Sequence, residues 1–388
     1  MSSKPVQLKV ARRGLVAPFI VMEILRAANE RAVEGADIRH LEVGQPGTGA
    51  PQGVIEAVRA ALGQSPLGYT EAFGLPALRQ RIARHYADLY GVTVDPSRIA
   101  VTTGSSAGFL LAFLASFEPG DRVVLTDPSY PCYRNILTAL GIEPVHVPVG
   151  PETGFQPSPA VLDQVSGSID GLVVASPSNP TGSMLSAPAL RALAEYCRDR
   201  GIRLVSDEIY HGITYGEPAS TALASTDEAI VVNSFSKYFS MTGWRLGWLV
   251  LPPDLVTPVE RLTQNLFISA PTVSQVGGLA AFDCREELEA NVARYARNRD
   301  LLLTELRAAG IERVAPADGA FYVYAEIGDL TNDSEAFCRR MLDEIGVAAT
   351  PGVDFDTGRG TRYIRFSYAG STEDVSEAAR RIRGWVGR

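Results

Sequence analysis

Between residues 53 and 250 the chain alternates short runs rich in Val, Ile and Leu with longer segments of helical periodicity. Continuous apolar runs separated by helices are typical of parallel strands buried inside a sheet. The predicted strands are 99–103, 122–126, 144–148, 171–175, 203–206, 229–233 and 246–251. Helical segments such as 107–117, 133–140 and 188–200 lie between them. The succession predicts an α/β fold, in which helices cover both faces of a mostly parallel sheet and form three α/β/α layers.

The sequence after residue 283 has a different pattern. One long charged helical stretch, 285–310, precedes short predicted strands at 321–326 and 363–368. This pattern is typical of a smaller α+β domain. A helix predicted at 18–34 has no place in the large sheet, and we expect it to pack on the smaller domain. The predicted domains are therefore a large one, 45–282, and a small one built from both chain ends, 1–44 and 283–388.

The composition excludes several classes of protein. With 36 basic and 44 acidic residues the net charge is −8, and no block of like charge indicates a surface for nucleic acid or acidic lipid. No apolar stretch approaches the roughly 20 residues that span a bilayer, and the N-terminus lacks the apolar core of a signal peptide. The 4 cysteines and 4 histidines are scattered without metal-binding spacing, so no metal is expected. We therefore expect a cytoplasmic protein that binds neither nucleic acid nor membranes.

Lysine is rare in this chain. Only three of the 36 basic residues are lysines, and Lys4 and Lys9 lie close to the N-terminus. The third, Lys237, lies in the interior of the sequence within S-F-S-K-Y-F-S. Arginine can replace lysine as a charge but not as a nucleophile, because a guanidinium does not lose its proton in proteins. Lys237 is therefore a candidate for covalent chemistry, and the alternative is a chance survivor of a strong preference for arginine.

Polar motifs follow several predicted strands, at the sheet edge where α/β proteins bind their ligands. V-T-T-G-S-S-A-G-F follows the strand 99–103 and opens a helix predicted to begin near Ser106. Its N–H groups and hydroxyls form a phosphate site or, alternatively, only a helix cap. S-P-S-N-P-T-G places Asn179 after the strand 171–175, and its alternative is a simple turn of Asn, Pro and Gly.

Two further motifs carry charged side chains. R-L-V-S-D-E-I-Y-H places Asp207 at the end of an apolar strand with Tyr210 three residues on, and a buried carboxylate there needs a cation. S-F-S-K-Y-F-S-M-T-G-W-R-L-G, whose lysine is 30 residues beyond Asp207, supplies Ser234, Ser236, Lys237 and Arg245. One amine, one acid, one phenol, one amide and a phosphate site at the same sheet edge are what a pyridoxal phosphate enzyme requires.

These motifs resemble those of the fold type I, class I and II aminotransferases, the aspartate aminotransferase superfamily, over nearly the whole chain. The motifs, in the order and spacing of that family, are L-G-Y-T-E-A-F-G-L-P-A-L-R, D-P-S-Y-P-C-Y, S-P-S-N-P-T-G, D-E-I-Y, S-F-S-K-Y-F-S-M-T-G-W-R-L-G and R-Y-I-R-F-S-Y-A. The resemblance implies a large domain that binds pyridoxal 5′-phosphate. It also implies transfer of an amino group between an L-amino acid and a 2-oxo acid by a ping-pong mechanism.

The resemblance assigns roles to individual residues. Lys237 would bind the cofactor as a Schiff base and move the α-proton of the substrate. Asp207 would keep the pyridine nitrogen protonated, so that the ring accepts electrons from the substrate. Asn179 and Tyr210 would hydrogen-bond the ring oxygen, and Tyr130 would stack on the ring. A cis peptide bond is expected after Asn179.

The remaining assignments from the resemblance concern the phosphate, the partner subunit and the substrate. The phosphate would be held by Gly104, Ser105, Ser106, Ser234, Ser236 and Arg245. Tyr69 would reach the phosphate from the other subunit of a homodimer with shared active sites. Arg365 would bind the α-carboxylate of the substrate, a task that suits a bidentate guanidinium, with Gly44 and Asn179 beside it. For Arg365 taken alone, the alternative is a surface charge beside Arg362.

Departures from the family pattern concern the choice of substrate. The N-terminal loop has V-G-Q-P-G-T-G-A-P where the family often has an acidic and an aromatic residue after the proline, and Asp356 stands where glycine is usual. Asn265 occupies the position at which aspartate-specific enzymes carry an arginine from the partner subunit. A dicarboxylate specialist is therefore less expected, although glutamate could still serve as amino donor.

Two alternative functions remain open at the level of sequence. The same scaffold supports other pyridoxal phosphate reactions, such as β-elimination by a carbon–sulfur lyase, because a fold does not fix the reaction. A non-catalytic ligand sensor is more remote, since about 40 residues precede the large domain and they contain no helix-turn-helix pattern. The sequence does not identify the amino donor, the acceptor or the pathway. It also does not give the number of subunits beyond a dimer.

Overall fold

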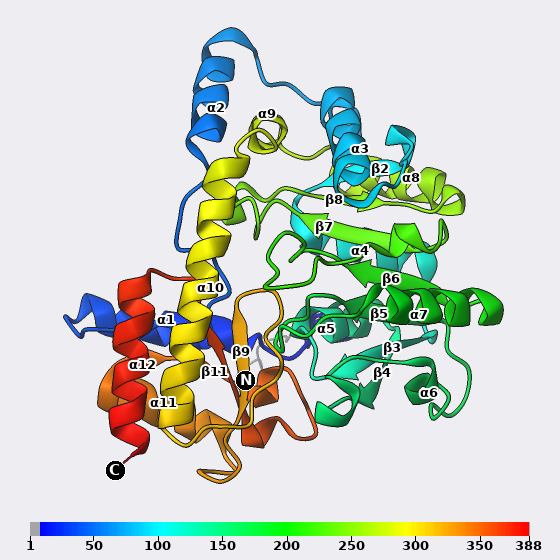
Figure 1. Ribbon diagram of the computed structural model, residues 1–388. Coiled ribbons are helices and arrows are strands. Elements are labelled where there is room, and N and C mark those ends of the chain that lie inside the picture. The colour runs from blue at the N-terminus through cyan, green and yellow to red at the C-terminus, as the bar shows by residue number, and fades with distance from the viewer. Residues whose placement is uncertain (1–7, 388) are drawn as a thin grey trace, which may run out of the picture.

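A seven-stranded sheet forms the centre of the larger part of the molecule (Figure 1). The computed structural model describes residues 8–387, and residues 1–7 and 388 lie outside it. The strands follow the order β2, β8, β7, β6, β5, β3, β4, and only β8 runs antiparallel to its neighbours. Their bounds are β2 Ile99–Thr102, β3 Arg122–Asp127, β4 Glu143–Pro148, β5 Gly171–Ala175, β6 Arg203–Asp207, β7 Ile230–Ser234 and β8 Gly247–Val250. The predicted mostly parallel sheet is confirmed. Each of its strands begins and ends within one residue of the predicted position.

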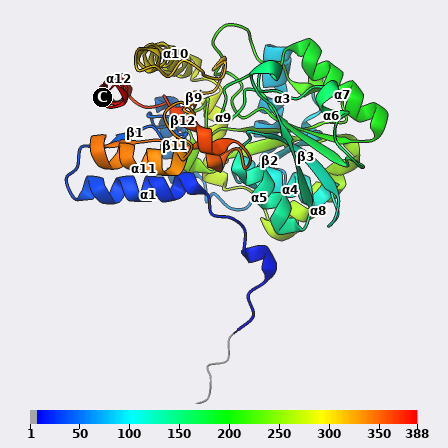
Figure 2. The same cartoon turned by 90° about the horizontal axis from the view of Figure 1, so that it is seen from below.

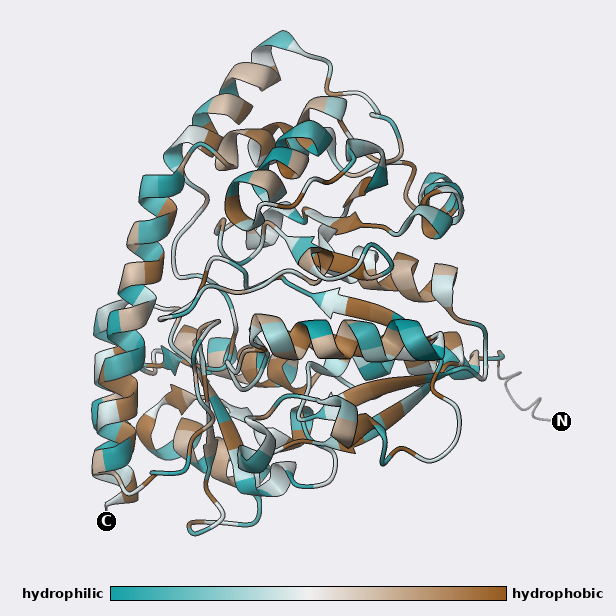
Figure 3. Cartoon of the chain, turned by 45° about the vertical axis from the view of Figure 1, so that its right-hand side comes forward, coloured by the Kyte–Doolittle hydropathy of each residue, from teal (hydrophilic) through white to brown (hydrophobic). Residues whose placement is uncertain are grey.

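Each face of this sheet carries its own hydrophobic core, because successive residues of a strand point to opposite sides. In β8, Trp248 and Val250 belong to one core and Leu249 to the other. The first face is covered by α3 (Pro76–Tyr90) and α7 (Ala187–Arg200), and the second by α4 (Gly104–Ser116), α5 (Pro131–Leu140) and α8 (Val256–Leu266). Figure 3 shows the hydrophobic colouring of the central strands between these helices. This is the predicted three-layer α/β/α arrangement.

A smaller sheet joins residues from both ends of the chain. Strands β11 (Thr350–Pro351), β12 (Tyr363–Ser367) and β9 (Tyr322–Glu326) are antiparallel, and β1 (Arg39–His40) pairs with β10 (Val347–Ala348). Helices α10 (Arg285–Ala308), α11 (Ser334–Ile345) and α12 (Thr372–Val386) contribute to the core around these strands. The sequence pattern predicts only β9 and β12, because two-residue strands such as β1, β10 and β11 show no periodicity.

Helix α1 (Ile20–Val33) packs against this smaller part, as predicted, with Ala28 in contact with Leu342 and Ala348. The segment before it leaves the body of the molecule (Figure 2), and its apolar residues Leu8 and Leu15 are exposed. The remaining helices are α2 (Gln52–Gln64), α6 (Pro159–Leu162) and α9 (Thr272–Ala281). Within residues 8–387, no helix combines the length and the apolar character needed to cross a bilayer.

One helix boundary differs from its prediction and affects the site. Helix α4 begins at Gly104, before the predicted start near Ser106. Gly104 has a φ of 74°, which glycine adopts without strain, so the chain turns sharply and the helix starts directly after Thr103. Ser105 and Ser106 therefore lie in the first turn, where the backbone N–H groups have no partner within the helix.

Candidate active site

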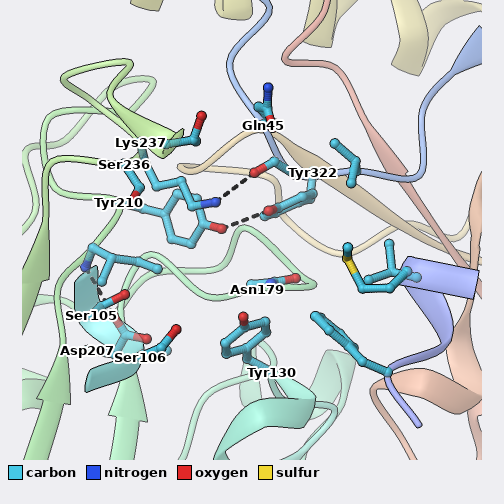
Figure 4. Close-up of a pocket in the computed structure, with 18 of the residues that line it drawn as sticks. Gln45, Ser105, Ser106, Tyr130, Asn179, Asp207, Tyr210, Ser236, Lys237 and Tyr322 are labelled. Atoms are coloured by element: carbon cyan, nitrogen blue, oxygen red, sulfur yellow. Dashed lines mark hydrogen bonds between the residues drawn. The ribbon is translucent and has the colours of Figure 1, made fainter. Parts of the chain in front are cut away.

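The carboxyl ends of β5, β6 and β7 and the first turn of α4 face a cavity of about 570 Å³ (Figure 4). Small-molecule sites usually measure about 300–1,000 Å³, so the cavity has room for a cofactor and a substrate. Strands β9 and β12 of the smaller sheet, the loop around Gly44 and the start of α1 form its other side. The cavity therefore lies between one core of the large sheet, which includes Tyr133, and the core of the smaller part, which includes Tyr322.

The amine of Lys237 points into this cavity from the loop that follows β7 (Figure 4). Its Nζ atom donates a hydrogen bond to the Gly44 carbonyl oxygen at 2.7 Å. Burial, together with the positive charges of Arg365 and Arg245, lowers the pKa of Lys237 to about 8. A usable fraction of the amine is therefore neutral, and hence nucleophilic, near neutral pH.

Asp207 ends strand β6 and lines the same cavity, with only 3% of its surface exposed. Its Oδ1 accepts a hydrogen bond from the Ile209 N–H at 3.0 Å, and its Oδ2 accepts one from the Tyr133 hydroxyl. Burial raises the pKa of Asp207 to about 6, because these hydrogen bonds and the charge of Lys237 offset only part of the desolvation. A cation placed against this carboxylate would favour its ionised form.

A polar cradle occupies the end of the cavity next to α4. Ser105 and Ser106 contribute from the first turn of this helix, and Ser236 and Arg245 from the chain after β7. Arg245 lies directly against Gly104, where any added Cβ would collide with the guanidinium. Helix N–H groups, three hydroxyls and a guanidinium are a donor set that binds phosphate.

Three residues that the resemblance assigns to the phosphate do not line the cavity: Gly104, which lies against Arg245, and also Ser234 and Tyr69. Ser234 lies behind the cradle, where its hydroxyl contacts Ser236 Oγ at 2.9 Å and accepts the Ser236 N–H at 3.0 Å. This position lets Ser234 orient Ser236 without reaching the cavity itself. Tyr69 lies in the loop after α2 and is 84% exposed. Its predicted role concerns the site of a second subunit.

The other end of the cavity is built around Arg365 of strand β12. Its Nη1 donates to Asn179 Oδ1 at 2.8 Å, and its Nη2 donates to Thr350 Oγ1 at 3.2 Å and to the Glu42 carbonyl oxygen. Arg365 is buried, and among the described residues its Nε has no hydrogen-bond partner. A buried guanidinium with an unused donor fits a carboxylate ligand. The peptide bond between Asn179 and Pro180 is cis, as the resemblance predicts.

Two tyrosines connect the ends of the cavity (Figure 4). The hydroxyl oxygens of Tyr210 and Tyr322 are 2.7 Å apart, and the guanidinium of Arg365 lies 4.4 Å from the centre of the Tyr322 ring. Gly44 lies so close to Tyr322 that an added Cβ would overlap the hydroxyl. Glycine at position 44 is therefore what allows Tyr322 to reach Tyr210.

Most of the residues assigned by resemblance face one cavity. They are Gly44, Ser105, Ser106, Tyr130, Asn179, Asp207, Tyr210, Ser236, Lys237, Arg245 and Arg365. Sequence reasoning missed Tyr133 and Tyr322, and also Phe19, Val21 and Met22 at the start of α1. Tyr133 follows Tyr130 by about one helical turn in D-P-S-Y-P-C-Y, so a signal was present. The other four reach the cavity only through tertiary packing.

Two of the positions that depart from the family pattern lie away from the cavity. Asp356 is buried and accepts hydrogen bonds from the N–H groups of Gly358 and Arg359 at 2.9 and 2.7 Å, so it holds a loop. Asn265 is exposed and donates to the Arg261 carbonyl oxygen at 2.7 Å. Gln45, from V-G-Q-P-G-T-G-A-P, does line the cavity.

Comparisons with known proteins all indicate one family. The family described as aminotransferase class I and II matches residues 36–382. The valine–pyruvate aminotransferase of Mycobacterium tuberculosis is 50% identical over 97% of this chain and 98% of its own. The aspartate/prephenate aminotransferase of Thermus thermophilus is 35% identical over 93% of this chain and 95% of its own. The crystal structure of an aminotransferase from Mycobacterium tuberculosis has a TM-score of 0.96 at 49% identity, covering 98% of this chain and 99% of that chain.

Proposed function

The chain belongs to the class I and II aminotransferases, and we propose that it binds pyridoxal 5′-phosphate beside Lys237 and prefers amino donors with apolar side chains. As an aminotransferase, it moves an amino group between an amino acid and a 2-oxo acid. The cofactor, the preferred donor and the number of subunits are the parts of this assignment that need an experiment.

The residues around the cavity fit pyridoxal phosphate at three points. Lys237 has a partly buried amine with a pKa of about 8, which suits the capture of an aldehyde. Asp207 is a buried carboxylate at a strand end, which suits a protonated pyridine nitrogen. The polar cradle beside α4 suits a phosphate group. Tyr130 also lines the cavity, and its ring would offer an apolar face to the pyridine ring.

Different residues of the chain have different roles around the cofactor. When bound, pyridoxal phosphate supplies an aldehyde for the amino group and a ring that takes up the electron pair of the broken Cα–H bond. Lys237 has the only amine among the described residues that line the cavity, and it moves the α-proton. Asp207, oriented by Tyr133 and the Ile209 N–H, holds a proton on the ring nitrogen. The Tyr210 hydroxyl, which contacts that of Tyr322 at 2.7 Å, would hydrogen-bond the ring oxygen.

The single observation that carries the substrate assignment is the distribution of charge. Among the described residues that line the cavity, the cations are Lys237, Arg245 and Arg365. Lys237 and Arg245 serve the cofactor, and Arg365 serves the α-carboxylate common to all amino acids. A second carboxylate, on the side chain of aspartate or glutamate, would find no further cation among the described residues that line the cavity and would be buried at a cost.

The part of the cavity left for the substrate side chain is apolar. Phe19, Val21 and Met22 form one wall of it, which we call the substrate wall. Each methylene buried against such a wall contributes about 0.8 kcal/mol, so larger apolar side chains gain most. The name of the valine–pyruvate aminotransferase, to which this chain is 50% identical, supports the same class of donor.

We also propose that the protein works as a homodimer with shared active sites. Tyr69 is 84% exposed on a loop that Thr272 holds through a hydrogen bond to the Gly68 carbonyl oxygen at 2.5 Å. The apolar side chains of Leu62 and Ile268 are also exposed, and a second subunit would cover them. A cytoplasmic location stays a prediction from the sequence.

A panel of amino acids, added one at a time to the cofactor-loaded protein without an oxo acid, tests this function. We expect valine, leucine and methionine to remove the visible absorbance of the bound cofactor, and to release their 2-oxo acids, faster than aspartate does. Faster reaction with aspartate would contradict the substrate assignment. Release of pyruvate and ammonia from a β-substituted amino acid, without conversion of the cofactor, would indicate a carbon–sulfur lyase.

A further inference from the structure

The substrate wall lies at the first turn of helix α1, and its position depends on how this helix end is held. The N-cap residue is Phe19, whose side chain offers no oxygen to the first N–H groups. A helix leaves up to four N–H groups without a partner at this end, and an uncapped start frays. The wall therefore needs support from elsewhere in the chain.

That support is Asp354, which is 334 residues away from Ile20 in the sequence. Its Oδ1 accepts the N–H of Ile20 at 3.4 Å, and its Oδ2 accepts the N–H of Val21 at 3.3 Å. Asp354 is fully buried, yet it does not line the cavity. It can therefore act on a substrate only through the residues that it holds.

Asp354 is itself fixed to the larger part of the molecule. It ends a short 3₁₀ helix, Gly352–Asp354, and its carbonyl oxygen accepts a hydrogen bond from Arg134 Nη2 of α5 at 2.7 Å. The same helix α5 follows directly after Tyr130, whose ring meets that of Phe19 edge-on at 5.8 Å. The carboxylate thus links the start of α1 to the side of the cavity that faces the cofactor.

We propose that Asp354 is a positioning residue that sets the size of the substrate side-chain site by anchoring the first turn of α1. This inference rests on the proposed function, because it takes the substrate wall to contact the side chain of the amino donor. Without the anchor, the first turn loses two hydrogen bonds and the wall withdraws from the cavity. Valine then loses apolar contacts, whereas the single methyl group of alanine loses few.

The test compares two variants of Asp354 with a matched control variant, each loaded with pyridoxal phosphate. Asp354→Ala should raise KM for valine by roughly tenfold, with kcat little changed, and should leave KM for alanine within about twofold. Asp354→Asn keeps the shape and one acceptor oxygen, so its effect on KM for valine should be smaller. If Asp354→Ala does not fold, the same comparison is made with Asp354→Asn. The control is Asp356→Ala, which removes a second buried acid that holds a different loop. It should lower the melting temperature but leave the ratio of the two KM values unchanged.

A second measurement does not depend on activity. Hydrogen exchange of the loaded enzyme should be faster at the start of α1 in Asp354→Ala than in the wild type or in Asp356→Ala. Unchanged exchange there would overturn the proposal. Equal increases in KM for valine and alanine would also overturn it, since they would place the effect on Arg365 and the common carboxylate. If the wild type itself prefers aspartate, the proposed substrate class fails, while the exchange data still decide whether Asp354 anchors α1.

Discussion

The two ends of the cavity are built in different ways. The cofactor end, formed by Lys237, Asp207 and the polar cradle, consists of charged and polar groups at the edge of the central sheet, and Asp207 and Ser236 are buried there. The substrate end combines one buried cation, Arg365, with the apolar substrate wall at the start of α1, whose residue Met22 is 51% exposed. One carboxylate from a distant part of the chain holds this wall. The two ends therefore have different roles. Substitutions at the cofactor end should lower turnover of every amino acid, and substitutions at the substrate end should change which amino acid reacts fastest.

The largest effect is expected from the removal of the Lys237 amine. Lys237→Ala should lower turnover of valine and alanine alike by about four orders of magnitude or more, because both the nucleophile and the base are lost. Lys237→Arg should be equally inactive, since it restores the charge without a nucleophile. Single-turnover rates with both amino acids measure the effect. An arginine variant with near-normal rates would contradict the role of the cofactor end.

The next largest effect is expected at Asp207. Asp207→Asn keeps the shape but loses the charge that holds a proton on the ring nitrogen, so kcat should fall by roughly 10²- to 10⁴-fold for all donors. The matched control is Glu208→Gln, which changes the neighbouring buried carboxylate; Glu208 accepts the Ala222 N–H at 2.8 Å and does not line the cavity. The control should affect stability more than kcat. A similar loss of kcat in both variants would argue against a direct role of Asp207.

The pH dependence of cofactor capture tests whether a charge at the substrate end changes the pKa of the amine at the cofactor end. Only the neutral amine attacks an aldehyde, and the pKa of Lys237 is lowered to about 8. Capture of pyridoxal phosphate by the cofactor-free protein should therefore quicken about tenfold per pH unit below that pKa and level off above it. Arg365→Gln removes one of the charges that lower this pKa, so its profile should move to higher pH. An unmoved profile would mean that the two ends are electrostatically independent.

The smallest effect is expected at Tyr322, which joins the two ends. Tyr322→Phe removes its hydrogen bond to Tyr210, and the loss of one such bond should lower kcat by roughly two- to tenfold. Tyr324→Phe is the control on the same strand. Its hydroxyl is buried without a partner among the described residues, and its ring stacks on Tyr363 at 4.9 Å. Equal kcat values for the two variants would show that the hydroxyl pair has no role in turnover.

The same two ends differ in how far the sequence could predict them. Asp207, Asn179 and Lys237 follow strands in short motifs, and parallel strands place their carboxyl ends at one edge, so local patterns were sufficient. The substrate wall has no such signal. It depends on Asp354, which lies 333 residues away from Val21 in sequence, and hydrophobic periodicity alone describes α1 as an ordinary amphipathic helix.

Two features of the cofactor end were also not predicted from the sequence. Helix α4 starts earlier than predicted, because a glycine pattern does not reveal that Gly104 takes a left-handed conformation against Arg245. Ser234 has the residue type expected of a phosphate ligand, but its hydroxyl is engaged with Ser236 behind the cradle. Residue type and spacing therefore predicted which segments form the site, and packing decided which side chains face the cavity.

The most direct test of the central claim is to locate the covalent attachment of the cofactor. The protein loaded with pyridoxal phosphate is treated with borohydride, which fixes the cofactor to the amine that holds it, and the labelled peptide is mapped by mass spectrometry. The chain offers only three lysines, so the result is unambiguous. We predict a single phosphopyridoxyl group on Lys237, with none in Lys237→Ala. A label on Lys4 or Lys9, or no label at all, would contradict the assignment of the cofactor end.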